Sequence, residues 1–194
     1  LQIERRTPTA NVIATIPGRD PKYRGQYVVL GAHLDHLGTR LALGSQASDS
    51  VFHGADDNAS GASALLRIAA DLMDRRSQLR RTVVLVWFTA EEGGLMGSRW
   101  FSDHASVPLD SVVAYLNLDM IGRRNPASDG SPTLRILGLP RSLATLDQVR
   151  QLTPGHPSAL ALDTIDANDS FCRSDQVSLM KKGVPVVAFT TGTH

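Results

Sequence analysis

Apolar residues in this chain follow two patterns: short continuous runs, and positions that recur every three or four residues. One run, Thr82–Thr89 (TVVLVWFT), is rich in β-branched residues and predicts a buried strand. Between Ala62 and Arg75 the apolar positions have the period of an α-helix, and the small polar residues of Asp56–Ser60 are suited to its N-terminus. Both kinds of element therefore contribute to one fold.

The rest of the chain gives further elements of both kinds. Strands are predicted at Thr9–Ile16, Gln26–Gly31, Ser111–Asp119, Thr133–Leu139 and Val184–Thr190. Helices are predicted at Leu95–His104, Arg141–Leu152 and Ser174–Lys182, and irregular loops at Arg40–Phe52 and Thr153–Ser170. This alternation predicts an α/β fold, a three-layer αβα sandwich with a mostly parallel, mixed central sheet.

Charged residues and an imidazole stand where three of the apolar runs end. His33 follows the second strand, Glu91 and Glu92 follow the central one, and Asp119 closes the next. Ligand crevices in such sheets lie outside the carboxyl ends of the strands. Several carboxylates in one crevice repel one another, so some stay protonated unless a cation is present. Imidazole with carboxylates suits zinc, and other divalent metals fit the same set.

Composition narrows the class of protein. The 194 residues, 42% hydrophobic and 20% charged, fit one soluble globular domain. The 20 Lys and Arg are offset by 19 Asp and Glu and form no long block, which argues against a nucleic-acid partner. The single cysteine, Cys172, excludes internal disulfides and a multi-cysteine zinc site. No apolar run reaches membrane-spanning length, so no membrane span is expected.

Four motifs, in this order and at these spacings, carry a family resemblance. They are GAHLDHLG (31–38), GADDNASG (54–61), TAEEGGLMGSRWF (89–101) and NLDMIG (117–122). Together they resemble the co-catalytic zinc exopeptidases, which include bacterial secreted aminopeptidases and enzymes of the glutamate carboxypeptidase type. The similarity covers roughly Asn11–Gly192. It implies a metal-dependent hydrolase, an aminopeptidase first of all, that acts on peptides, and a periplasmic or secreted location.

The resemblance also implies a set of metal ligands. His33 and Asp119 would bind one zinc ion, Glu92 would bind a second, and Asp57 would bridge the two. The family's fifth ligand is a histidine a few residues beyond the last strand, usually after a tyrosine. This chain stops at His194, which precedes that position; the alternative, that His194 itself substitutes as the ligand, is the less favoured one. We therefore expect residues 1–194 to be a single metallopeptidase catalytic domain truncated at its C-terminus, with truncation at the N-terminus left open. A complete site would hold two zinc ions and this chain one or none, and this chain would be inactive if the fifth ligand is missing.

The resemblance assigns the catalytic roles as well. Glu91 would be the general base, taking a proton from a water that bridges the two metal ions and returning it to the leaving amine. Asp35 would hold His33 in one tautomer. A cis peptide bond is implied after the bridging acid, at Asp57–Asn58. His36 and His53, which flank these motifs, receive no role.

Two other functions fit the same architecture. One is a glutaminyl cyclase that uses a single zinc ion; the acid pair Glu91–Glu92 and an intact Asp57 look more like the peptidases. The other is a non-catalytic relative that keeps the fold as a binding module. That alternative predicts lost ligands, whereas four of the five are present.

Overall fold

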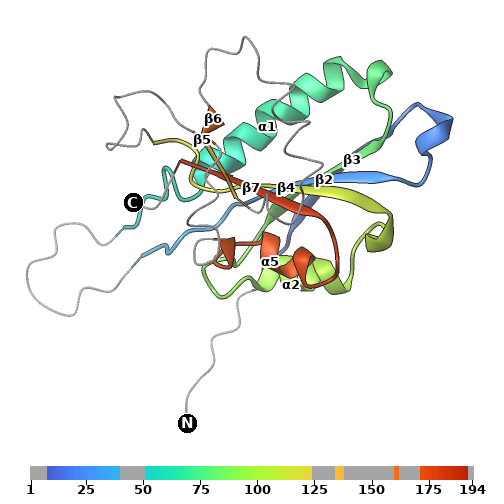
Figure 1. The fold of residues 1–194 in the computed structure, drawn as a ribbon. Coiled ribbons are helices and arrows are strands. Elements are labelled where there is room, and N and C mark those ends of the chain that lie inside the picture. Colours follow the sequence, from blue (N-terminus) through green and yellow to red (C-terminus); the bar gives the residue numbers. More distant parts are fainter. Residues whose placement is uncertain (1–7, 40–50, 124–133, 138–159, 162–170, 192–194) are drawn as a thin grey trace, which may run out of the picture.

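The structure is a computed structural model that describes residues 8–39, 51–123, 134–137, 160–161 and 171–191. Figure 1 shows the fold of this part of the chain. Its strands are β1 (Val12–Ile16), β2 (Tyr27–His33), β3 (Thr82–Phe88), β4 (Val112–Leu118), β5 (Leu134–Leu137), β6 (Leu160–Ala161) and β7 (Val186–Thr190). Its α-helices are α1 (Ala59–Asp74), α2 (Met96–Asp103) and α5 (Gln176–Met180). Short 3-10 helices occur at Pro21–Tyr23, Arg76–Gln78 and Leu109–Ser111.

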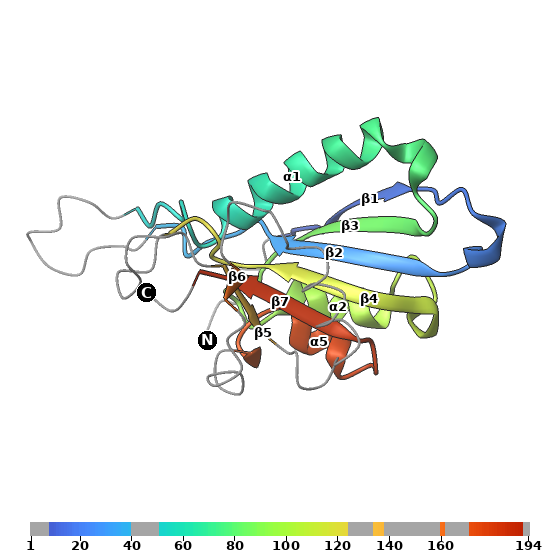
Figure 2. The same cartoon turned by 45° about the horizontal axis from the view of Figure 1, so that its top comes forward.

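All seven of these strands form one mixed sheet in the order β1-β3-β2-β4-β7-β5-β6 (Figure 2). The four central strands are parallel, with β2 pairing on one side with β3 and on the other with β4, and β4 pairing with β7. Toward the edges β1 runs antiparallel to β3, and β5 runs antiparallel to β7. The predicted fold class is confirmed, because the central strands of the sheet are parallel and antiparallel strands pair with them toward both edges, which makes the sheet mostly parallel but mixed.

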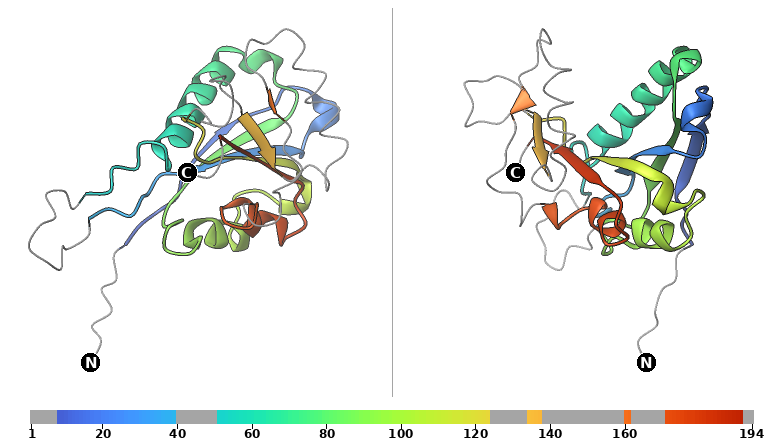
Figure 3. Two further views of the ribbon diagram at one scale, coloured as in Figure 1. Left: turned by 60° about the vertical axis from the view of Figure 1, so that its left-hand side comes forward. Right: turned by 45° about the vertical axis from the view of Figure 1, so that its right-hand side comes forward.

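Helices cover both faces of the sheet. α1 packs on one face, and α2 and α5 pack side by side on the other (Figure 3). β3 serves both layers because alternate side chains of a strand point to opposite faces. Its Val83, Leu85 and Trp87 lie in the core under α1, whereas Val84, Val86 and Phe88 lie in the core under α2 and α5. The continuous apolar run at 82–88 is thus explained by burial on both faces.

The predicted elements among the described residues are confirmed in type, with ends shifted by a few residues. The predicted helix at 141–152 lies outside the described residues. The two-residue strand β6 lies within the segment predicted to be irregular, because two residues are too few to show an alternating pattern. None of the described helices is long and apolar enough to cross a membrane.

Candidate metal centre

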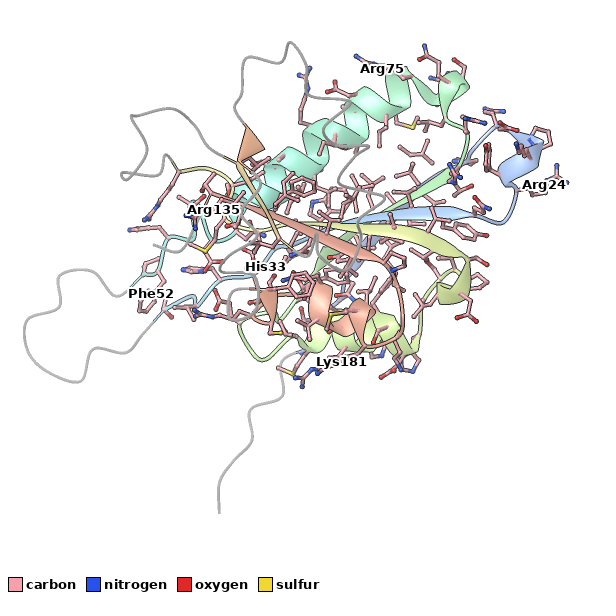
Figure 4. All side chains as sticks on the ribbon, in the orientation of Figure 1. Arg24, His33, Phe52, Arg75, Arg135 and Lys181 are labelled. Carbon is pink, nitrogen blue, oxygen red and sulfur yellow. The ribbon has the colours of Figure 1, made fainter. Side chains whose placement is uncertain are left out.

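The carboxyl ends of the central strands bring the predicted site residues to one edge of the sheet. β2 ends at His33, whose neighbour Leu34 still donates its N–H to the carbonyl of Phe88, the last residue of β3 (2.8 Å). After β3 and β4 the chain turns at Ala90 and Met120, both with positive φ (52° and 55°). In Figure 4 the labelled His33 lies near this end of the strands, between the helical layers.

Asn58 fixes the start of α1 against the end of β4, and so places Asp57. Its side-chain oxygen accepts hydrogen bonds from the N–H groups of Gly61 (3.0 Å) and Met120 (3.2 Å). Its amide nitrogen donates to the carbonyl of Leu118 (2.9 Å). The side chain is therefore both the N-cap of α1 and a link to the strand that carries the other acid. The Asp57–Asn58 peptide bond is cis, which confirms the expectation from the resemblance.

His33 is the buried centre of the cluster, with only 1% of its surface exposed. Its Nε2 lies 3.1 Å from Oδ1 of Asp57 and 3.3 Å from Oδ1 of Asp119. Its Nδ1 lies 3.1 Å from the backbone carbonyl of Asp35, so Nδ1 carries the proton that this carbonyl accepts. Burial lowers the pKa of His33, but the hydrogen bonds with Asp119 and Asp57 outweigh it and raise the pKa to about 11. Without a metal ion, a proton on Nε2 therefore holds the two carboxylates together.

Asp35 contacts both His33 and the acid pair. Its backbone carbonyl lies 3.1 Å from Nδ1 of His33, and its carboxylate Oδ1 lies 3.8 Å from the same nitrogen. The carboxylate also accepts hydrogen bonds from the N–H groups of Glu91 (Oδ1, 3.1 Å) and Glu92 (Oδ2, 3.2 Å). The reason is the turn after β3, which directs two free backbone donors at the loop after β2. Asp35 thus fixes the acid pair and His33 at once.

The second imidazole of the site is one that the sequence interpretation left without a role. Nδ1 of His36 lies 2.8 Å from Oε1 of Glu92 and 3.9 Å from Oδ2 of Asp57. The signal available in the sequence was the spacing of His33 and His36, three residues apart after a strand. Outside a helix that spacing does not define a direction, so it could not show where His36 points.

Glu91 lies in the same cluster, and its pKa is raised. Burial and the neighbouring acids Asp175, Asp119 and Glu92 raise the pKa of Glu91, the charge of His33 lowers it, and the net result is a pKa of about 8. The hydrogen bond from His33 holds the pKa of Asp57 below its usual range. Two carboxyl groups of one site thus differ in their readiness to accept a proton, which is typical of acid–base chemistry.

The donors present fit zinc. In a tetrahedral zinc site, metal–ligand distances of about 2.0–2.2 Å separate neighbouring donor atoms by roughly 3.4 Å. The two carboxylate oxygens around Nε2 of His33 are already at 3.1 and 3.3 Å. Ligand atoms of His33, Glu91 and Asp119 lie within 4.8 Å of one another, and so do those of His36, Asp57 and Glu92. The four predicted ligands are therefore brought together, while His194 lies outside the described residues.

Comparison with known proteins agrees with this geometry. The model of peptidase family M28 matches residues 11–194, and the chain belongs to that family. It is 32% identical over 201 residues to leucine aminopeptidase 2 of Trichophyton equinum, covering 98% of this chain and 35% of that protein.

Two solved structures extend the comparison. LapB from Legionella pneumophila superposes with a TM-score of 0.69 at 26% identity, covering 94% of this chain and 45% of that one. BSAP, a zinc aminopeptidase from Bacillus subtilis, superposes at 0.62 with 23% identity, covering 93% and 39%. The chain spans less than half the length of each of these three proteins.

Proposed function

We propose that this protein is a zinc-dependent aminopeptidase whose complete site holds two zinc ions. His33, Asp57 and Asp119 would hold one ion, and Asp57 and Glu92 would hold the other. Membership of the M28 family and the aminopeptidase names of its relatives support the reaction class. The observation that carries the proposal is the buried imidazole of His33, whose Nε2 faces two carboxylate oxygens at 3.1 and 3.3 Å. That arrangement suits an ion as readily as a proton.

Each residue then has a definite task. Bound zinc supplies Lewis acidity, which polarises a peptide carbonyl and lowers the pKa of a water. Glu91 accepts the proton of the attacking water and delivers it to the nitrogen of the leaving peptide. Its neighbour Glu92 cannot do this while its oxygens are bound to metal. Asp35 keeps both acids in place through their backbone N–H groups.

The test is zinc-dependent release of free amino acids. The purified protein, stripped with a chelator and then titrated with zinc, is incubated with short peptides that differ in their first residue, and with the same peptides acetylated at the N-terminus. We expect release of the N-terminal residue from the free peptides only, with activity that returns as zinc is added. No turnover by the full-length protein at saturating zinc would support the non-catalytic alternative. Ring closure of an N-terminal glutamine without peptide cleavage would support the cyclase.

The proposal extends to location and substrate. We place the protein in the periplasm or outside the cell, as the family resemblance implies, and fractionation of the source cells with activity assays on each fraction tests this. The substrates in that compartment would be peptides with a free N-terminus.

A further inference from the structure

An arm projects from the edge of the sheet that carries the proposed metal centre. It consists of residues 34–39, which follow β2, and residues 51–54, which precede α1, and the two segments run side by side away from the body (Figures 1 and 2). Thr39 and Val51 form an antiparallel bridge between them. The arm therefore holds its side chains at defined positions next to the site.

Exposed apolar side chains gather on this arm. Leu34, Leu37, Val51 and Phe52 are each 40–54% exposed. Apolar side chains that are exposed together on one surface, rimmed by polar groups, mark a place where something binds. The N–H of Phe52 donates to the carbonyl of Gly38 (2.8 Å), which fixes the backbone that carries this ring. The arm thus offers apolar surface on a fixed backbone beside the site.

Phe52 is placed beside the proposed centre by its contact with His36. The two rings meet edge to face, with centroids 6.4 Å apart at 70°. Nδ1 of His36 in turn lies 2.8 Å from Oε1 of Glu92, a proposed zinc ligand. The backbone at Gly54 closes in on the same imidazole, since a β-carbon there would lie 2.8 Å from that of His36. A single positioned imidazole therefore separates the ring of Phe52 from Glu92, and 40% of Phe52 stays open to solvent.

The direction of the arm indicates which part of a peptide would meet Phe52. Only the first residue of the substrate lies before the scissile bond of an aminopeptidase, so the rest of the peptide has to leave the site through an open side. In Figure 4 the labelled Phe52 lies on the arm, farther from the body than His33. An extended peptide advances about 3.3–3.6 Å per residue, so the side chain of the second residue lies one short step beyond the reacting carbonyl. A step of that size is comparable to the one imidazole between Glu92 and Phe52.

We propose that Phe52 binds the side chain of the residue that follows the scissile bond, so that the enzyme prefers peptides whose second residue is apolar or aromatic. This inference rests on the proposed aminopeptidase function and adds a selectivity for the second residue to it. An exposed aromatic ring on a fixed backbone suits such a partner, because aliphatic and aromatic side chains pack against its face and edge. Phe52 then contacts the substrate away from the reacting atoms.

A simpler role for Phe52 makes a different prediction. If its ring only supports the imidazole of His36, and through it Glu92, then loss of the ring lowers the rate on every peptide by the same factor. Such a common factor cancels when the kcat/KM values of two peptides are divided by each other. The ratio between peptides that differ only in their second residue therefore reports a direct contact with that residue and nothing else.

The experiment compares peptides that share the first residue and differ in the second. Zinc-loaded, full-length wild-type protein and the variants Phe52→Ala and Trp100→Ala are assayed on the amides of leucyl-glycine, leucyl-leucine and leucyl-phenylalanine. Trp100, 55% exposed on α2 and stacked on His104, is the matched control, an exposed aromatic ring outside the arm. Bound zinc is counted in each variant, and the binding of each peptide amide is measured by calorimetry.

We expect the wild type to favour leucine and phenylalanine over glycine at the second position by about 10-fold in kcat/KM, mainly through KM. Phe52→Ala should lose most of this preference and keep its zinc, whereas Trp100→Ala should keep the preference. A wild type that is indifferent to the second residue would overturn the assignment. So would a Phe52→Ala variant that retains the preference or that is slowed equally on all three peptides.

The calorimetric measurement separates this inference from the proposed function. If zinc-loaded wild type cleaves none of the peptides, the aminopeptidase proposal fails. Binding of the leucyl-phenylalanine amide that weakens about 10-fold in Phe52→Ala, with the leucyl-glycine amide affected much less, would then still establish the contact with the second side chain. Equal changes for both amides would overturn that contact as well.

Discussion

The carboxylate of Asp35 accepts a hydrogen bond from the backbone N–H of Glu91 at 3.1 Å, linking the loop after β2 to the turn after β3. The same carboxylate accepts a second hydrogen bond, from the backbone N–H of Glu92 at 3.2 Å, so the contact is bidentate. Both N–H groups belong to a turn at the edge of the sheet, where no neighbouring strand can pair with them. The position of the proposed base and of a proposed ligand thus depends on one side chain in the loop that follows the strand ending at His33.

Replacing Asp35 by alanine should therefore impair the site without unfolding the protein. We expect a loss of about 10–100-fold in zinc affinity or in kcat/KM, because the acid pair loses its fixed position. Zinc titration and steady-state kinetics with a peptide substrate check this. Asp110→Ala, on an exposed 3-10 helix, is the control and should change neither quantity. Wild-type values in Asp35→Ala would show that the turn holds its shape unaided.

The neighbours Glu91 and Glu92 should respond differently to the same isosteric change. Glu91→Gln removes the proposed proton acceptor, so kcat should fall by about 10²–10⁴-fold while zinc stays bound. Glu92→Gln weakens a proposed ligand, so zinc occupancy should fall together with the rate, and excess zinc should restore part of it. Elemental analysis alongside kinetics distinguishes the two variants. Normal turnover by Glu91→Gln would refute its assignment as the base.

Removal of zinc should lower the thermal stability of the wild type. A ligand present at 100 times its Kd stabilises the folded state by about 2.7 kcal/mol, which for a chain of this size corresponds to roughly 5–10 °C in Tm. We expect a drop of this size on adding a chelator, with recovery on adding zinc but not magnesium, because magnesium prefers six oxygen ligands. In His33→Ala the chelator should have a much smaller effect. A chelator-insensitive Tm in the wild type would argue against tight zinc binding.

The sequence was sufficient for the sheet because the strands are long enough to show their pattern. The run at 83–88 is apolar at every position and belongs to a strand inside the sheet, and acids that follow such runs emerge at one edge. His33 and Asp119 could be placed together in this way. Asp57 required the resemblance, since its position depends on the hydrogen bonds of Asn58 to β4.

The sequence could not predict where the side chains of the loops point or what they contact. The direction of His36 depends on Phe52 and Gly54, which approach it from the far side of a long loop. The carboxylate of Asp35 found partners 56 and 57 residues away along the chain. Such contacts follow from how two turns meet in space, and no local period encodes them. Asp175 is a further case, because it is the N-cap residue of α5 but its side chain makes no capping hydrogen bond and is fully buried.

Asp175 should make the metal-free protein less stable as the pH rises. It is fully buried, and neither carboxylate oxygen has a hydrogen-bond partner among the described residues. Burial raises the pKa of Asp175 from its ordinary value of 3.8 to about 7. The folded state therefore keeps a proton that the unfolded state releases, so stability is highest below about pH 4 for this group and is lost as the pH rises toward 7.

The variant Asp175→Asn tests this directly, because it keeps the shape and removes the charge. In the presence of a chelator, its Tm should exceed that of the wild type by clearly more at pH 8.5 than at pH 5, because only part of the loss in the wild type has occurred at pH 5. Asp103→Asn is the control of opposite sign: Asp103 pairs with Lys182 at 2.6 Å, and this hydrogen bond lowers the pKa of Asp103. That variant should gain nothing at pH 8.5. A Tm difference between Asp175→Asn and the wild type that is the same at both pH values would mean that Asp175 is already ionised in the folded state at pH 5, as it is in the unfolded state.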